Sequence, residues 1–485
     1  MTLDDAVPSE FRPSESHKRK LPTALSPLAY REYRLFWSAS VVSNVGTWMY
    51  LAAIGWLTEV VTDSPLQVSL VVTAGIIPLL FFSPLGGLLA DRMPRVRLMI
   101  LTVMLQTIVS IGLALAYLAN ATTFWVLFMF SMLNGCVASL GAPVQQAIIP
   151  QLLPERHLRG GVVMNSTQWN ISRSVGPLIA GYVVTIWSEG AVFWINTATF
   201  LAMIFVLARM TPIPAPKASS EIKSSEITSS ETSIPSTEIN NGQKSDDTGR
   251  GKNTKDQKDD SVGKDDTAEK DDAVREIKGI LAEFGEGIRY VLNRRELIAV
   301  LVSASMLSVV LAPLQWLAPV IARDFFDAEA AGFGQLAGSF GIGSILGGVV
   351  LLGVGNSVAT ARLVLIGYGG QAISVALLAG APTLWVGAVT MGLSGFFFVF
   401  VSSSLITVLQ TLAGDEFRGR MMSLWMMLFG ISVPISNFAH GLLAEFVIGM
   451  RWLLLFDSIL IVAYTVTVAT RRTLHQTEGH QTEGM

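Results

Sequence analysis

The sequence is poor in charge and in cysteine. Only 15% of its 485 residues are charged, whereas 51% are hydrophobic. Water-soluble domains carry about 25% charged residues, so this chain has too few to cover a surface that faces water. Its single cysteine, Cys136, lies in an apolar segment. One cysteine excludes an intramolecular disulfide and leaves no basis for a cysteine-based metal site.

Further absences argue against other classes. Residues 1–34 contain no apolar run, so we do not expect a cleavable signal peptide there. The nucleotide-binding pattern GxxxxGK[ST] does not occur, which argues against an activity that this chain alone drives by ATP hydrolysis. No nucleophile, general base or metal-ligand set stands out. We therefore expect no enzyme activity, no cofactor, no metal and no nucleic-acid partner.

Long apolar runs recur along the chain instead. A helix of about 20 apolar residues crosses the ~30 Å hydrocarbon core of a bilayer. A transmembrane β-barrel would show short segments of alternating polarity. The sequence therefore predicts an all-α membrane protein with twelve transmembrane helices in two six-helix bundles, at residues 35–210 and 297–471.

Polar segments flank and join the two predicted bundles. Residues 211–273 lack aromatic residues and are rich in Ser, Lys, Asp and Glu, which predicts a disordered cytoplasmic linker; a regulatory phosphorylated segment is the alternative. Residues 274–296 repeat apolar side chains at helical spacing and predict an amphipathic helix at the membrane interface. Residues 1–34 and 472–485 are expected to be cytoplasmic tails.

The basic residues are concentrated in alternate loops between the predicted spans. Arg92, Arg95 and Arg362 lie on one side of the predicted membrane, and the loops on the other side hold only Arg323 and Arg451. Lys and Arg are enriched in cytoplasmic loops. We therefore expect both termini in the cytoplasm and a multi-pass protein of the plasma membrane, with the bacterial inner membrane as the expected location.

The loop after the second predicted span carries the most specific motif, GGLLADRMPRVRL from Gly86 to Leu98. Its matches to the pattern Gly-x-Leu-Ala-Asp-Arg-x-Gly-Arg are Gly87, Leu89, Ala90, Asp91, Arg92 and Arg95. On these residues the chain resembles the Major Facilitator Superfamily. The resemblance implies a gating loop in which Asp91 contacts the start of span eleven, near Gly419 and Arg420, and latches the two halves together. The alternative is a loop that only sets orientation.

A second motif lies in the fifth predicted span, SRSVGPLIAG from Ser172 to Gly181. Gly176, Pro177 and Gly181 match the Gly-Pro motif that marks antiporters of the superfamily. Proline removes one helix hydrogen bond and kinks the span. The alternative is a packing kink with no bearing on transport direction. Other segments, such as DEFRGRMMSLWMMLFGISVP, resemble the exporter subgroup that includes enterobactin exporters and macrolide efflux proteins.

The resemblance also implies a central cavity lined by spans one, four, seven and ten. The candidate substrate-binding residues are the polar and aromatic groups of those spans together with one arginine of span five: Ser43, Asn44, Trp48, Asn134, Ser139, Arg173, Ser305, Gln315, Trp316 and Ser403. Few of them are charged, which favours an amphipathic organic substrate. For each Ser or Asn, a hydrogen bond between helices is at least as good an explanation.

Ionisable residues within the spans are few, and each is a candidate for function. Arg173 could bind an anionic substrate, pair with a carboxylate, or bind backbone carbonyls that Pro177 leaves free. Glu59 and Asp63, near the outer end of span one, could exchange a proton, although a solvated interfacial carboxylate is the commoner case. Glu59, Asp63 and Arg173 are therefore the candidates for proton coupling.

The last two spans hold three further ionisable residues. His440 and Glu445 make only a weak candidate for a proton relay, because their spacing of five residues places them only approximately on one face. Asp457 in span twelve is expected to pair with a neighbour.

These features predict a secondary active transporter that exports an amphipathic organic compound by alternating access, in exchange for protons. A siderophore, a macrolide-like drug or a secondary metabolite would fit. Its partners would be this substrate, protons and the lipid bilayer, and the chain is expected to act as a monomer. A lysophospholipid translocator and a non-transporting membrane sensor or assembly partner are the alternatives.

Overall fold

The computed structural model describes residues 23–210 and 289–471 with gaps at 292 and 356. Within its helices, the side chains of residues 23–25, 91, 159, 310–313, 414–420 and 471 are not described. The linker predicted at 211–273, most of the helix predicted at 274–296 and most of the two tails lie outside the described residues. The contact predicted between the Asp91 side chain and the start of span eleven lies outside them too.

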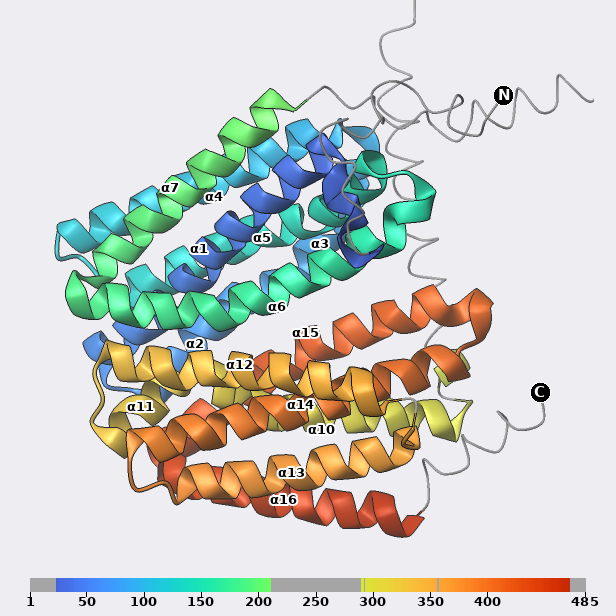
Figure 1. Cartoon of the computed structure of the whole chain (residues 1–485). Coiled ribbons are helices and arrows are strands. Elements are labelled where there is room, and N and C mark those ends of the chain that lie inside the picture. The colour runs from blue at the N-terminus through green and yellow to red at the C-terminus, as the bar shows by residue number, and fades with distance from the viewer. Residues whose placement is uncertain (1–22, 211–288, 292, 356, 472–485) are drawn as a thin grey trace, which may run out of the picture. The chain divides into compact units, whose positions relative to one another are not determined.

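The first bundle contains six spans made of seven helices (Figure 1). These helices are α1 (Arg31–Thr62), α2 (Pro65–Ile76), α3 (Pro78–Arg92), α4 (Arg95–Leu118), α5 (Phe124–Leu152), α6 (Glu155–Ile186) and α7 (Glu189–Arg209). The second span is divided into α2 and α3, which meet at Ile77. Pro78 begins α3 because a proline at the first helical position has no backbone N–H to leave unpaired.

The second bundle repeats this plan. Its helices are α10 (Arg295–Trp316), α11 (Ala318–Phe326), α12 (Ala330–Val354), α13 (Thr360–Ala379), α14 (Leu384–Leu412), α15 (Gly414–Phe446) and α16 (Gly449–Arg471). The seventh span is divided at Leu317, directly before the Ala-Pro pair that opens α11.

The prediction of an all-α protein with twelve transmembrane helices in two bundles is confirmed. In the described ranges, ten spans are long and apolar enough to cross a membrane. The other two spans, α1 and α6, have 32 residues each but are more polar. Both lie at the interface between the bundles, where a polar residue can face protein rather than lipid.

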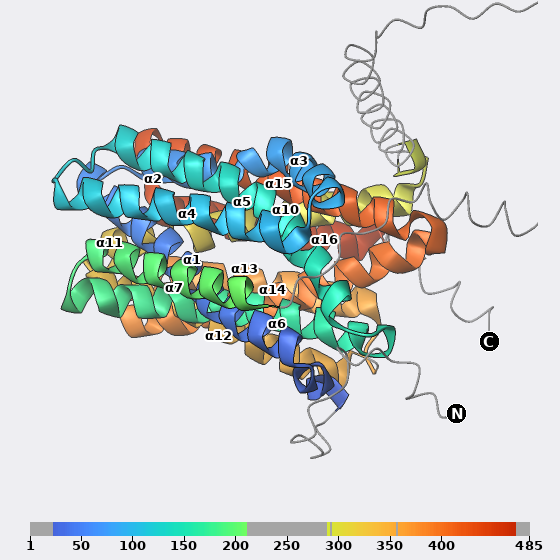
Figure 2. The same cartoon turned by 90° about the horizontal axis from the view of Figure 1, so that it is seen from above.

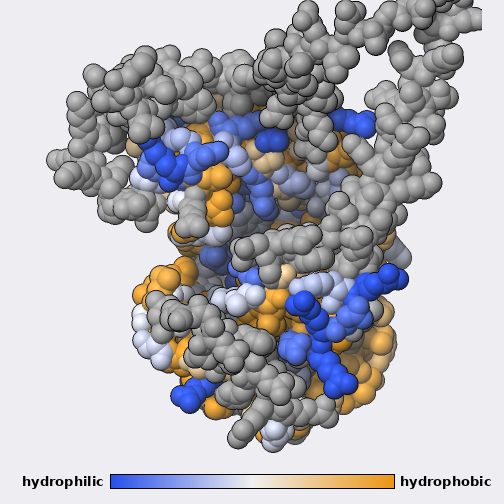
Figure 3. Space-filling view, turned by 90° about the vertical axis from the view of Figure 1, so that its right-hand side faces the viewer, coloured by the Kyte–Doolittle hydropathy of each residue, from blue (hydrophilic) through white to orange (hydrophobic). Residues whose placement is uncertain are grey.

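The two bundles meet at one end and part toward the other (Figure 1). We call the end where α1 begins and α16 finishes the arginine-rich end, because it carries Arg31, Arg95 and Arg362. Hydrophilic residues gather there on both bundles (Figure 3). The other end, with Asp63 and Arg323, is the opposite end.

Two helix pairs form most of the contact between the bundles. Helix α6 packs against α12, and α15 packs against α2; both pairings are visible from above (Figure 2). Gly181 of α6 allows this approach, since a Cβ there would lie 2.5 Å from the Ala330 carbonyl oxygen and 2.8 Å from the Gly334 Cα. These contacts involve the second half of α6 and the first half of α12, so they close the opposite end.

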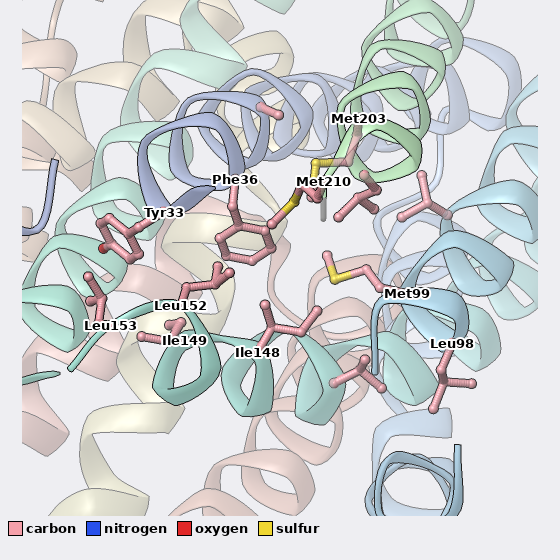
Figure 4. Packing of buried hydrophobic residues seen from close by; sticks show 14 of the residues in the cluster. Tyr33, Phe36, Leu98, Met99, Ile148, Ile149, Leu152, Leu153, Met203 and Met210 are labelled. Atoms are coloured by element: carbon pink, nitrogen blue, oxygen red, sulfur yellow. The ribbon is translucent and has the colours of Figure 1, made fainter. Parts of the chain in front are cut away.

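The first bundle has its own core at the arginine-rich end (Figure 4). Phe36 of α1, Met99 of α4, Ile148 of α5 and Met203 of α7 are all buried in one cluster. Tyr33 also donates a hydrogen bond of 3.0 Å to the Gly161 carbonyl of α6. These contacts tie the helices of the first bundle together where the two bundles separate, which favours movement of this bundle as a rigid unit.

Candidate functional site

A cavity lies between the two bundles. Helices α1, α2 and α6 form one wall, and α10, α11 and α12 form the other. Four of the ten predicted substrate-binding residues line it: Trp48, Arg173, Gln315 and Trp316. Most of the remaining lining is apolar, as ligand-binding cavities usually are.

Aromatic rings bridge the two walls of this cavity. Trp48 stacks on Trp316 with ring centroids 6.0 Å apart and planes 20° apart. Trp56 stacks on Phe333 of α12 at 5.7 Å and 12°. Gly176 of the Gly-Pro motif brings α6 against the first pair, because a Cβ there would lie 2.5 Å from the Trp48 Cβ. The motif therefore helps to set the position of Trp48.

Arg173 is the one charged residue in the cavity lining of the described chain. Its guanidinium carbon lies 5.8 Å from the Phe340 ring centroid and 5.6 Å from that of Phe398. The Nε atom is buried and has no hydrogen-bond partner. Among the described residues, neither the carboxylate nor the backbone carbonyls suggested by the sequence are paired with this side chain.

The remaining six predicted substrate-binding residues are absent from the described cavity lining: Ser43, Asn44, Asn134, Ser139, Ser305 and Ser403. The hydroxyl of Ser139 donates to the Gly135 carbonyl at 2.6 Å, and that of Ser305 donates to the Leu301 carbonyl at 3.1 Å. Bonds of this kind within one helix satisfy a polar group without a ligand. Ser305 borders a separate, apolar crevice between α10 and α15.

An ionic cluster closes the opposite end of the cavity. Arg323 of α11 donates a 2.9 Å hydrogen bond to the Glu59 carbonyl, and lies 3.9 Å from the Glu59 carboxylate and 3.2 Å from that of Asp63. Glu59 is 1% exposed and Asp63 is 75% exposed at the side chain. The alternative of a solvated interfacial carboxylate therefore holds for Asp63 but not for Glu59. In the sequence analysis, Arg323 entered only the count of basic residues per loop that predicts the orientation in the membrane.

A second polar contact joins the bundles at the same end. Glu445 of α15 accepts hydrogen bonds from the Ser64 hydroxyl at 2.8 Å and from the Leu66 backbone N–H at 3.4 Å. His440 pairs instead with Asp457 of α16, at 2.9 Å. The structure thus gives no support for a relay between His440 and Glu445, and Asp457 has the neighbour that the sequence led us to expect.

The predicted gating loop is described in part. Arg95 donates a 2.7 Å hydrogen bond to the Ala147 carbonyl, which ties α4 to α5. Arg92 is the last residue of α3. A Cβ on Gly87 would meet nothing within 4 Å, whereas one on Gly86 would lie 2.5 Å from the Leu140 carbonyl oxygen. Close packing in this state therefore depends on Gly86, which directly precedes the first residue that matches the family pattern, Gly87.

The chain matches one family model and is similar to known efflux and export proteins. The family model described as "Transmembrane secretion effector" matches residues 22–229 and 264–484. Macrolide efflux protein A of Streptococcus pyogenes is 20% identical over 436 residues, 89% of this chain and 93% of that protein. The enterobactin exporter EntS of Escherichia coli is 21% identical over 397 residues, 81% of this chain and 80% of that protein.

Two further matches differ in what they cover. The Staphyloferrin A transporter of Staphylococcus aureus is 26% identical over 186 residues, 37% of this chain, and the chain spans about half of that relative's length, 47%. A bacterial homologue of the human lysosomal transporter Spinster, solved in an inward-facing, unoccupied conformation, superposes with a TM-score of 0.67 at 11% identity. The superposition covers 92% of this chain and 98% of that one. At this identity the likeness shows the fold alone.

Proposed function

Because the chain belongs to the transmembrane secretion effector family of the Major Facilitator Superfamily, we propose that this multi-pass membrane transporter exports an amphipathic organic compound in exchange for protons. The observation that carries the proposal is the central cavity, which is walled by helices of both bundles and contains an aromatic stack and one cation. A cavity at the interface of two bundles is where alternating access acts. The relatives named above are transporters, which favours this function over a sensor or an assembly partner.

The arrangement of the bundles supports one step of such a cycle. If the arginine-rich end faces the cytoplasm, as the distribution of basic residues predicts, the bundles part toward the cytoplasm and are closed toward the outside. An exporter loads its substrate in this state. Separation of α6 from α12 and of α15 from α2 would then open the opposite end and release the substrate.

Glu59 is the carboxylate best placed for proton coupling. It is buried in the closed opposite end beside Arg323, and its Oε2 atom has no hydrogen-bond partner. Opening of that end would expose this carboxylate to outside water, so its surroundings would change in every cycle. A proton gained there would weaken the attraction to Arg323, and its release toward the cytoplasm would restore it. Arg173 and Asp63, the other candidates from the sequence, are less suited, because the guanidinium keeps its proton and the Asp63 side chain is 75% exposed in the closed state.

Transport should depend on the proton gradient in everted membrane vesicles. We expect radiolabelled erythromycin or an iron-free catecholate siderophore to accumulate when the vesicle interior is acidic, and a protonophore to abolish the accumulation. Glu59→Gln should remove most of the gradient-driven accumulation while exchange of internal for external substrate continues, because Gln cannot carry the proton.

Asp63→Asn is the matched control, since that carboxylate is exposed in the closed state and its loss should change accumulation little. If the substrate accumulates to the same level with and without the protonophore, proton coupling is contradicted. Equal behaviour of Glu59→Gln and the wild type would remove Glu59 from the mechanism.

A further inference from the structure

We propose that the central cavity selects organic anions and that Arg173 recognises their charge through a direct contact. The inference rests on the proposed function, since it names the substrate class of the same cavity. The sequence leaves three partners open for Arg173: an anionic substrate, a carboxylate or backbone carbonyls. Among the described residues, the last two are not paired with its side chain.

The first argument is the uncompensated charge. A guanidinium cannot lose its proton in a protein, and an isolated charge within the membrane interior is costly unless something pairs with it. No Asp or Glu is among the described residues that line the cavity. A bound anion would supply the missing charge.

The second argument is the kind of polar atom that is left without a partner. The Arg173 Nε and the Trp48 Nε1 both belong to residues of the cavity lining, and both are buried without a hydrogen-bond partner. Each of these groups can only donate. Two unmet donors on residues that line one cavity favour a ligand that brings acceptors. A carboxylate matches an arginine best because it can accept two parallel hydrogen bonds.

The third argument is the apolar surface around the charge. The rings of Phe340 and Phe398 lie against the guanidinium and hold it by cation–π attraction, but rings offer no acceptor to its N–H groups. The Trp48–Trp316 stack supplies a flat aromatic surface in the same cavity. The combination fits an aryl carboxylate or a similar anion, with its ring near the tryptophans and its charge on Arg173.

Binding to the purified full-length protein in lipid nanodiscs tests this inference without transport. The probes are naphthalene-2-carboxylate and naphthalene-2-carboxamide, which share one ring system and differ in charge. We expect the wild type to bind the carboxylate roughly 10- to 100-fold more tightly, as a charge-assisted hydrogen-bonded pair implies. Arg173→Met should bind the two probes equally, and Arg173→Lys should keep part of the preference.

Thermal unfolding of the ligand-free protein separates recognition from a structural role. Removal of an unpaired buried charge should raise the Tm of Arg173→Met above that of the wild type, whereas loss of a structural hydrogen-bonding arginine would lower it. Equal binding of the two probes to the wild type, absence of binding at millimolar concentration, or a carboxylate preference that survives in Arg173→Met would each overturn the inference.

These results are independent of the transport assay. Anion binding that depends on Arg173, together with absence of proton-driven accumulation, would contradict the proposed export cycle and leave the binding site in place.

Discussion

Replacement of Arg323 by alanine should open the opposite end of the protein. The arginine is the cation that joins α11 of the second bundle to the Glu59 carbonyl, to the Glu59 carboxylate of α1 and to the carboxylate of Asp63, which follows α1. Its loss leaves the buried Glu59 without a partner, which costs about 1–3 kcal/mol. A difference of this size changes the ratio of closed to open states roughly 5- to 150-fold.

Reactivity of an introduced cysteine can measure this change. Ser69 of α2 is buried against Gly441 of α15 at the opposite end, so Ser69→Cys reports separation of the bundles once the native Cys136 is replaced by serine. We expect a membrane-impermeant maleimide to label this cysteine slowly in the otherwise wild-type protein and much faster in the Arg323→Ala background.

Arg451→Ala is the matched control for that experiment. Arg451 is the other arginine of this side, but its described contacts are to Phe325 within the second bundle, so its loss should leave labelling unchanged. Slow labelling in Arg323→Ala would show that packing of α6 on α12 and of α15 on α2 closes this end without the ionic cluster.

Substitution of Gly341 by leucine should have a comparably large effect through packing. A Cβ at Gly341 of α12 would overlap both the side chain and the Cα of Ser174 on α6. Backbone lies within the overlap, so a change of rotamer cannot relieve it. Overpacking costs about 1–3 kcal/mol or more, and separation of the bundles is the available relief. We expect transport to fall at least roughly tenfold and labelling of Ser69→Cys to rise.

Gly348→Leu on the same helix controls for the change of residue type. A Cβ at Gly348 would meet nothing within 4 Å, so this variant should insert, fold and transport nearly as the wild type does. Normal transport by Gly341→Leu would mean that α6 and α12 need not approach this closely during the cycle, and the proposed closed state would lose its main support.

The sequence does not predict which prolines divide a span into two helices. Pro84, Pro143, Pro177 and Pro434 lie inside unbroken helices. In contrast, α2 ends at Ile76, two residues before Pro78, and α10 ends at Trp316, two residues before the Ala318–Pro319 pair. Proline weakens a helix wherever it occurs. Which proline divides a span depends on whether neighbouring helices can satisfy the backbone groups that it frees, and the sequence does not contain that information.

The membrane class, the twelve spans and the two bundles follow from the amino-acid sequence, because apolar runs of membrane length reflect the cost of placing polar groups in hydrocarbon. Which polar residues meet depends on how the helices pack. Arg323 and Glu59 are 264 positions apart, and Glu445 and Ser64 are 381 apart. Helical spacing shows which residues share a face, but helices that are apolar all round give no sign of which face meets the other bundle.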